Sequence, residues 1–309
     1  MYVVRTHEHE LHLYTVSIDS GSVDDKVLMS GNSYYDVQLS ARYANNNLAY
    51  VDDGDGKVSI SLYNIADERK HSCELDFKPS NDCELFYLPA SGLIYLNDKT
   101  GYYVINIEGE TVKPLDYEHD DANPPCVVEN GDGTRIAFGK LNSVYIMNSQ
   151  GETVKTLPGS GMNVISMAFH KFKDKDYETL VVYYDNGKIF RYNADTGDIE
   201  GSSETTIYTN VAAKANMEFH DESGMLYITR KGSLSIVETD RWIEYAFIES
   251  CLGYAKESDR FITMSYESEE KYKMGYFKHY TLEDLKAKAA KILQGEEMSE
   301  EMKRQYGLI

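Results

Sequence analysis

The sequence predicts an all-β fold, a seven-bladed β-propeller with a short C-terminal helical tail. Short apolar strands recur through the first 280 residues, Asp-Gly and Asn-Gly turns separate many of them, and two long segments repeat each other without a gap. Asp-Gly and Asn-Gly between apolar runs favour tight hairpins, because Gly adopts positive φ at no steric cost. We expect the propeller over residues 1–280 and the tail, packed on it, over residues 281–309.

The clearest repeat has a period of 42 residues. Residues 104–115 read VINIEGETVKPL and residues 146–157 read IMNSQGETVKTL, with Gly109 and Gly151 at the same place in each. A period of about 40–45 residues is typical of propeller blades that hold four strands each. Dividing about 280 residues by this period gives about 6.7 units, which favours seven blades over six or eight.

The expected units follow one another along the chain. The first is partial, with strands near residues 2–6, 11–18 and 26–29, and the last has three strands. In order, the units span residues 1–30, 34–78, 82–117, 123–158, 163–204, 214–249 and 250–279. From Thr281 the apolar residues take helical spacing, and Gly295 is expected to end that helix.

Ring closure has two alternatives. Residues 3–6 pair either with residues 271–279, which would close the last unit, or with residues 11–17, which would leave closure to residues upstream of this chain. Closure matters because an unpaired strand edge is an aggregation hazard.

The net charge of −20 limits the classes of partner. Nucleic acids and anionic membranes are bound by clusters of Lys and Arg, so neither is expected here. No apolar run approaches the ~20 residues of a membrane span, and the N-terminus carries no secretory pattern. These features predict a cytoplasmic protein.

The motifs that could bind a metal are weak. His7 and His9 would share a strand face but lack a third fixed ligand. A calcium loop around Gly56 would need carboxylates at Val51 and Leu62. The four cysteines are too far apart for a zinc site, and no nucleophile elbow or phosphate loop occurs. We expect no cofactor, no metal and no catalytic residues.

Several turn residues resemble the bacterial WD-repeat family. Residues 219–224, which read FHDESG, stand where that family has its Phe-Ser-Pro-Asp-Gly corner. The single tryptophan, Trp242, lies elsewhere, so the hydrogen-bond network around the family's Trp is not assigned. The pairs at the family's Trp-Asp position are Tyr63-Asn64, Ile105-Asn106, Met147-Asn148 and Tyr192-Asn193.

Residues 280–308 look like the C-terminal extension of bacterial WD-repeat proteins in which the propeller follows an effector region, such as a TIR, caspase-like or signalling-NTPase domain. The resemblance implies a non-catalytic interaction, sensor or scaffold propeller. Its partner would be another protein or an upstream effector domain. The resemblance also favours ring closure by upstream residues.

In propellers of this family, the loops between blades and the loops between second and third strands share the face that commonly binds partners. Many of these loops are acidic here, so we expect a basic or polar partner surface. The alternative is a propeller hydrolase, similar to lactonases, with a metal ion in the axial channel. The residues expected to contact a partner are Asp52, Asp53, Asp55, Asp98, Asp120, Asp121 and Asp185.

Overall fold

A computed structural model shows the fold. It describes residues 2–7, 10–17, 20, 22–30, 41–53, 57–117, 125–159, 161–205, 215–220, 223–230, 232–255, 259–268 and 271–278. Within these ranges every regular element is a β-strand, and no helix that could cross a membrane is found. The expected helical tail at residues 281–309 lies outside the described residues.

The described strands form seven sheets, numbered here I to VII in chain order. Sheet I holds β1 (Tyr2–His7), β2 (Glu10–Val16) and β3 (Val23–Ser30). Sheet II holds β4 (Ala41–Ala44), β5 (Asn47–Asp52), β6 (Ser59–Asn64) and β7 (Lys70–Glu74). Sheet III holds β8 (Glu84–Leu88), β9 (Leu93–Asp98), β10 (Gly101–Asn106) and β11 (Thr111–Leu115). Sheet IV holds β12 (Cys126–Glu129), β13 (Arg135–Lys140), β14 (Ser143–Asn148) and β15 (Thr153–Leu157).

Sheet V holds β16 (Val164–His170), β17 (Thr179–Tyr184), β18 (Lys188–Asn193) and β19 (Ile199–Glu204). Sheet VI holds β20 (Asn216–Phe219), β21 (Leu226–Arg230), β22 (Ser233–Glu238) and β23 (Ile243–Glu249). Sheet VII holds β24 (Cys251–Ala255), β25 (Arg260–Ser268) and β26 (Lys271–Lys278). The strands of each sheet lie within the unit that the sequence spacing predicts for them.

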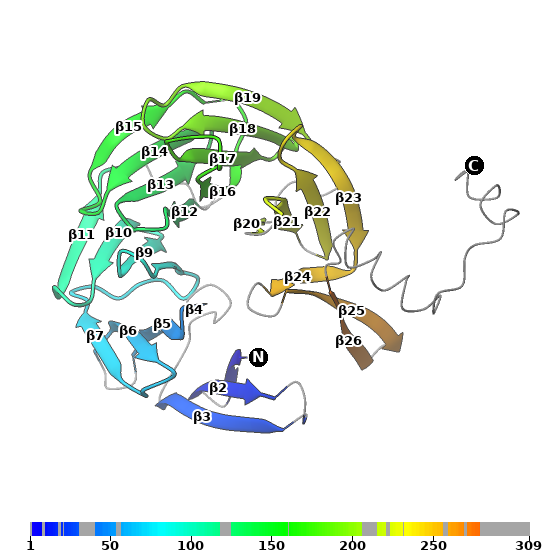
Figure 1. The fold of residues 1–309 in the computed structure, drawn as a ribbon. Helices are drawn as coiled ribbons and strands as arrows, with labels where there is room; N and C mark the ends of the chain where they lie inside the picture. Colours follow the sequence, from blue (N-terminus) through cyan, green and yellow to red (C-terminus); the bar gives the residue numbers. More distant parts are fainter. Residues whose placement is uncertain are drawn as a thin grey trace, which may run out of the picture.

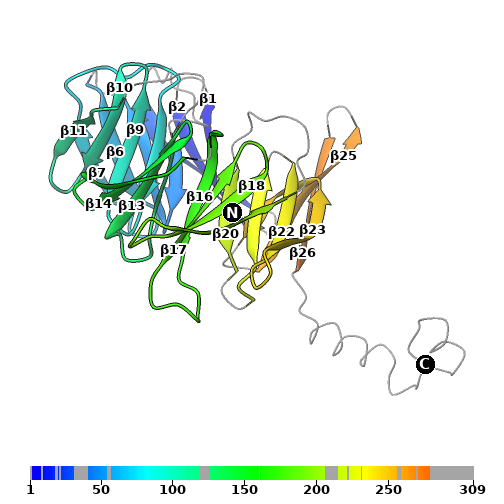
Figure 2. The same cartoon turned by 90° about the horizontal axis from the view of Figure 1, so that it is seen from above.

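In every sheet the strands lie side by side in chain order and pair antiparallel. The sheets succeed one another around an arc, with β4, β12, β16 and β20 toward its centre and β7, β11, β15, β19 and β23 on its outer rim (Figure 1). Figure 2 shows from above how the sheets stand next to each other around the arc. This all-β architecture of many small antiparallel sheets is compatible with a propeller-like repeat fold.

The repeated Asn at the end of the third strand shapes the turn that follows. Asn64 Oδ1 accepts hydrogen bonds from the backbone N–H groups of Ala66 and Asp67, at 2.9 and 3.1 Å. Asn148 Oδ1 accepts from the N–H groups of Gln150 and Glu152, both at 3.0 Å. Asn106 and Asn193 cap the corresponding turns in the same way. A side-chain acceptor at this place mimics a backbone turn, which explains why the repeat carries Asn there.

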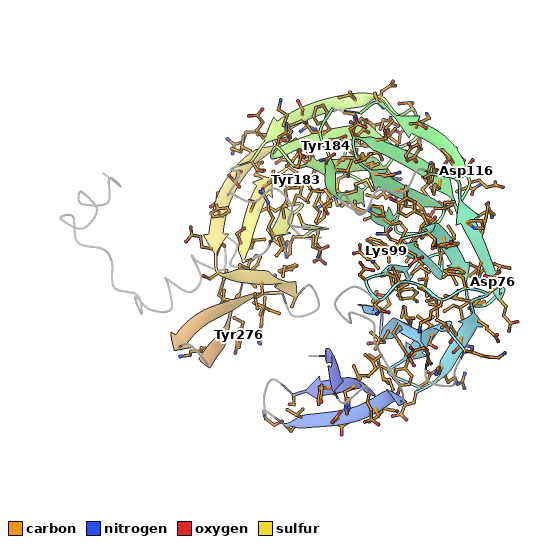
Figure 3. The ribbon with its side chains drawn as sticks, turned by 180° about the vertical axis from the view of Figure 1, so that it is seen from behind. Asp76, Lys99, Asp116, Tyr183, Tyr184 and Tyr276 are labelled. Carbon is orange, nitrogen blue, oxygen red and sulfur yellow. The ribbon has the colours of Figure 1, made fainter. Side chains whose placement is uncertain are left out.

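The hydrophobic core is divided among the junctions between sheets. Six clusters of buried side chains each combine residues of two successive sheets, from I with II to VI with VII. Tyr183 and Tyr184 are neighbours on β17, and they point to opposite sides of sheet V (Figure 3). Tyr183 joins the cluster shared with sheet VI, whereas Tyr184 joins the cluster shared with sheet IV. Strand alternation thus lets one strand support two junctions.

The pairing of β1 answers the question left by the two alternatives for ring closure. Val3 lies opposite Tyr14 and Thr6 lies opposite Leu11, so residues 3–6 pair with β2. Among the described strands, β1 belongs to a different sheet from β26, and no pairing between the two is found. Among the described strands, sheets I and VII have three members each, whereas sheets II to VI have four.

Candidate partner-binding face

One end of the sheets carries the turns between second and third strands, together with the links between sheets. We call this end the hairpin face. Because the strands of each sheet alternate in direction, both kinds of connection fall at the same end. The contacts agree: the N–H of Val164, which opens sheet V, donates to the carbonyl of Leu141 in the hairpin of sheet IV at 2.7 Å.

Asp98, at the end of β9, is buried, and both of its carboxylate oxygens accept hydrogen bonds from within the fold. Its Oδ1 accepts hydrogen bonds from the N–H and the Oγ of Ser80, at 2.6 and 2.7 Å. Its Oδ2 accepts from the N–H and the Oγ1 of Thr100, at 3.2 and 2.7 Å. Burial alone would raise the pKa of Asp98, but the hydrogen bonds from Ser80 and Thr100 outweigh it and lower the pKa below the usual 3.8. Asp98 therefore ties the link between sheets II and III to the hairpin of sheet III.

Asp52, at the end of β5, is also buried, and its carboxylate has partners within the fold. Ser61 Oγ on β6 donates to Asp52 Oδ2 at 3.1 Å, and Lys70 on β7 forms an ion pair with the same oxygen. The carboxylate of Asp52 thus connects three strands of sheet II. Although the sequence predicts partner contacts for both Asp52 and Asp98, the structure gives each of them internal donors.

Asp53 and Asp185 differ from these two. They occupy equivalent places, since each is the first residue after the second strand of its sheet. Both are half-buried, and the Oδ1 atom of each is buried without a hydrogen-bond partner among the described residues. Burial raises the pKa of Asp53 and the negative charge of Asp52 raises it further, whereas Lys78 acts in the opposite direction. An incoming cation or N–H donor would relieve this cost of burial.

The hairpin face also holds two cations that the sequence interpretation overlooked. Lys140 ends β13 and lies over the ring of Tyr102 in sheet III, 5.4 Å from its centroid. Arg230 ends β21, lies 4.6 Å from the ring centroid of Tyr183, and donates to Thr205 Oγ1 at 3.3 Å. Asp52, Asp98, Lys140 and Arg230 all occupy the last position of a second strand. Aligning these strand ends in the sequence would have revealed a recurring charged position.

The remaining predicted residues have no described surroundings. Asp55, Asp120 and Asp121 lie outside the described residues, and the side chains of His7 and His9 do too. Within the described part of the chain, no group of three or more His, Cys, Asp or Glu side chains is placed to hold a metal ion. Cys73, Cys83 and Cys251 are buried thiols, Cys126 is half-buried, and burial raises the pKa of Cys83 to about 12.

Ser223, His220 and Asp259 form a series of polar contacts at the end of sheets VI and VII that is opposite the hairpin face. Ser223 Oγ is 2.8 Å from His220 Nδ1, and His220 Nε2 is 3.4 Å from Asp259 Oδ1. A nucleophile would also need N–H donors aimed at a developing oxyanion. The two amides that follow Ser223 are engaged within the turn: Gly224 N–H donates to the carbonyl of His220 and Met225 N–H donates to Ser223 Oγ. We interpret these contacts among Ser223, His220 and Asp259 as a structural connection between sheets VI and VII.

No protein-family model matches the chain, and no curated protein matches it either. The class of the protein is thus defined by its fold, an all-β chain of small antiparallel sheets that is compatible with a propeller.

Proposed function

We propose that this chain is a seven-bladed, WD-repeat-like β-propeller that works as a non-catalytic protein-interaction module, in the role of sensor or scaffold. The observation that carries the proposal is the pair Asp53 and Asp185. They occupy the same place in sheets II and V of the hairpin face, and each has a buried acceptor oxygen without a donor among the described residues. Such acceptors favour a partner that supplies Lys or Arg side chains.

The charge of the chain supports the same class of partner. At −20, the protein attracts basic protein surfaces and repels nucleic acids and anionic membranes. The partner in this proposal is a separate cytoplasmic protein or an upstream effector domain, as in the bacterial WD-repeat proteins that the sequence resembles. Asp55, Asp120 and Asp121 belong to the proposed contact surface together with Asp53 and Asp185.

The test removes the negative charge of these two side chains and leaves the carboxylates of Asp52 and Asp98 unchanged. The double variant Asp53→Asn with Asp185→Asn is compared with the wild type in affinity capture from bacterial lysate, followed by calorimetry with the purified partner. We expect binding to weaken roughly tenfold, equivalent to about 1.4 kcal/mol. Asp52 and Asp98 are not suitable test sites, because their substitution would disturb the fold.

The matched control is Asp198→Asn with Asp240→Asn. Both residues are exposed, and both lie in turns between third and fourth strands, away from the hairpin face. The control changes the net charge by the same amount, so it separates a local contact from a general effect of charge. Equal affinity of both double variants for the partner would refute the role of the hairpin face.

A further inference from the structure

The junction between sheets V and VI holds a guanidinium with an unmet hydrogen-bond donor. Arg191, on β18, is half-buried, and its Nη1 atom is buried without a hydrogen-bond partner among the described residues. The guanidinium lies over the ring of Trp242, 4.4 Å from its centroid, in the turn between β22 and β23 of sheet VI. Burial lowers the pKa of Arg191. Because a buried donor without an acceptor is costly, an oxygen ligand at this place would be stabilising.

The acidic side chain nearby has partners of its own. The negative charge of Glu200, on β19, acts against the lowering of the pKa of Arg191. However, Glu200 Oε2 accepts a hydrogen bond from Lys175 Nζ at 2.5 Å, and Glu200 Oε1 accepts from the hydroxyl of Tyr177. Glu200 therefore belongs to a separate polar cluster and leaves Arg191 Nη1 without an acceptor.

A second unmet donor faces the same junction. The Oγ of Ser203, on β19, is buried and has no hydrogen-bond partner among the described residues. Arg191 lies opposite Gly201, and Ser203 lies opposite Ile189, so the four residues share one face of sheet V. Ile189 packs in the hydrophobic cluster shared with sheet VI, which identifies this face. Arg191 Nη2 lies 2.1 Å from the place that a Cβ of Gly201 would take, so the guanidinium rests directly on this glycine.

In sheets III and IV, a cation at the corresponding place finds an acceptor in the next sheet. The positions of Arg191 and Gly201 correspond to Val104 and Lys113 in sheet III and to Ile146 and Lys155 in sheet IV. Lys113 Nζ donates to the carbonyl of Gln150 in sheet IV at 3.4 Å. Lys155 Nζ donates to the carbonyl of Asp195 in sheet V at 2.8 Å. In sheet V the cation is on the third strand instead of the fourth, and its Nη1 has no such acceptor among the described residues.

The fourth strand of sheet V is also smaller at the next position on this face. Leu115 of sheet III and Leu157 of sheet IV pack in the junctions with the sheets that follow them. Ser203 takes the corresponding place in sheet V. Sheet V thus has a short side chain with a hydroxyl donor where the two preceding sheets fill the junction with leucine.

We propose that the junction between sheets V and VI binds a carboxylate group, which accepts hydrogen bonds from Arg191 Nη1 and Ser203 Oγ. Guanidinium groups donate well to carboxylates, and such charge-assisted hydrogen bonds are among the strongest in proteins. A single cation matches a single negative charge, and the neighbouring charge of Glu200 disfavours a phosphate dianion. The carboxylate belongs either to a free organic acid or to an acidic side chain of another protein. The site is separate from the hairpin face, because Trp242 lies in a turn at the opposite end of the sheets.

Trp242 is the single tryptophan of the chain, so its fluorescence reports directly on this site. Sodium acetate is titrated into the full chain, and acetamide with sodium chloride at equal ionic strength is the neutral comparison. We expect only acetate to change the emission of Trp242 in a saturable way, because it partly neutralises the cation stacked on the ring. Acetate should also raise the free energy of unfolding measured in urea. Arg191→Met should weaken acetate binding roughly tenfold, and Ser203→Ala should weaken it roughly fivefold.

The chain offers a matched control for each of these variants. Arg241→Met and Ser202→Ala remove the same groups from exposed positions next to Trp242 and Ser203, and both should leave acetate binding unchanged. If acetate produces no saturable response, water or another part of the chain satisfies the two donors, and the proposal is overturned. Equal affinity of the wild type and the Arg191→Met variant for acetate would overturn it as well.

Two capped amino acids distinguish the sources of the carboxylate. A glutamate that is acetylated and amidated carries only its side-chain charge, and the equally capped glutamine is its uncharged counterpart. Binding of the capped glutamate, and not of the glutamine, would support an acidic side chain of a protein as the ligand. Binding of acetate alone would support a small organic acid. Partner capture through Asp53 and Asp185 is measured separately, so failure of this proposal leaves the role of the hairpin face untouched.

Discussion

Single polar side chains hold the turns of this protein. The Asn that ends a third strand accepts backbone N–H groups in four successive sheets, II to V. At the other end of the sheets, Asp98 gathers four donors from Ser80 and Thr100. Both replace backbone hydrogen bonds that a tight connection cannot make for itself.

Replacing Asn148 by Ala should lower the free energy of unfolding by about 1 kcal/mol, because two turn amides lose their acceptor. Asn148 Nδ2 also donates to Glu152 Oε2 at 2.9 Å, and this bond is lost as well. Urea titration measures the change. Gln150→Ala alters an exposed side chain of the same turn and should have an effect within about 0.5 kcal/mol. Equal effects of both substitutions would contradict the capping role.

Asp98→Asn should destabilise the protein by about 2 kcal/mol at neutral pH, because a buried carboxylate with four donors is lost. The pKa of Asp98 is lowered in the folded state, so its contribution is complete above the unfolded pKa of 3.8 and is lost as pH falls through the still lower folded pKa. The stability gap between wild type and variant should therefore narrow below about pH 4. Urea titrations between neutral and acidic pH would show a constant gap if this assignment were wrong.

At the scale of the elements, adjacent sheets are tied at the ends opposite the hairpin face. The carboxylate of Glu129, at the end of β12, accepts the N–H groups of Ala90 and Ser91 in the turn of sheet III, at 2.6 and 2.8 Å. Gly133 approaches the same turn so closely that an added Cβ would lie 2.6 Å from Ser91 N. Its φ of +69° also favours Gly.

Gly133→Ala should destabilise the protein more than Gly92→Ala does. Gly92 has nearly the same φ, +71°, but nothing lies within 4 Å of the position its Cβ would take. Both variants carry the cost of positive φ, about 1 kcal/mol. Gly133→Ala must in addition separate two sheets, which should cost at least about 1 kcal/mol more. Thermal or urea unfolding of the two variants measures this difference, and equal stabilities would disprove the close contact.

At the scale of the whole molecule, each sheet is stabilised by contacts with the sheets that precede and follow it in the chain. Each hydrophobic cluster joins two successive sheets, and none of the six combines described residues of sheets I and VII. Polar contacts follow the same order: Asn130 of sheet IV donates to Glu178 of sheet V at 2.8 Å, and His220 of sheet VI meets Asp259 of sheet VII. The free energy of unfolding of such a molecule is approximately a sum of contributions from the individual sheets and from the junctions between neighbouring sheets, as in a linear repeat protein.

Hydrogen exchange should therefore be slowest in β17, whose six residues are all buried, and faster in sheets I and VII. Leu13→Ala removes a buried side chain from the junction of sheets I and II. It should accelerate exchange in those two sheets and leave β17 unchanged. Mass spectrometry of peptides from each sheet provides the measurement. Uniform acceleration across all sheets would show that the molecule unfolds as a single unit instead.

Much of the strand layout could be predicted from the sequence, because strands and turns depend on local patterns. The expected unit at residues 163–204 corresponds to strands between Val164 and Glu204, and that at 250–279 corresponds to strands between Cys251 and Lys278. The third strand of sheet I begins at Val23, three residues earlier than expected, because Val16 and Val23 pair across the turn. Such an extension depends on cross-strand pairing, which a local pattern does not reveal.

The candidate site was less predictable. Asp52 and Asp53 are adjacent acids in one loop, yet their environments differ because successive residues near a strand end point in opposite directions. Asp52 meets Lys70, which lies 18 residues away in the sequence, whereas the Oδ1 of Asp53 meets no described donor. The sequence interpretation treated the two as equivalent.

By itself, the sequence determined the strand positions, the Asn turns and the acidic character, since each follows from residue type and spacing. Only the tertiary structure decided which carboxylates have partners inside the fold and which strand β1 pairs with. These outcomes depend on contacts between residues far apart in the chain, such as Asp98 with Ser80 or Glu129 with Ala90. A local pattern indicates which contacts a residue can form, whereas the packing of neighbouring sheets determines which partner it contacts.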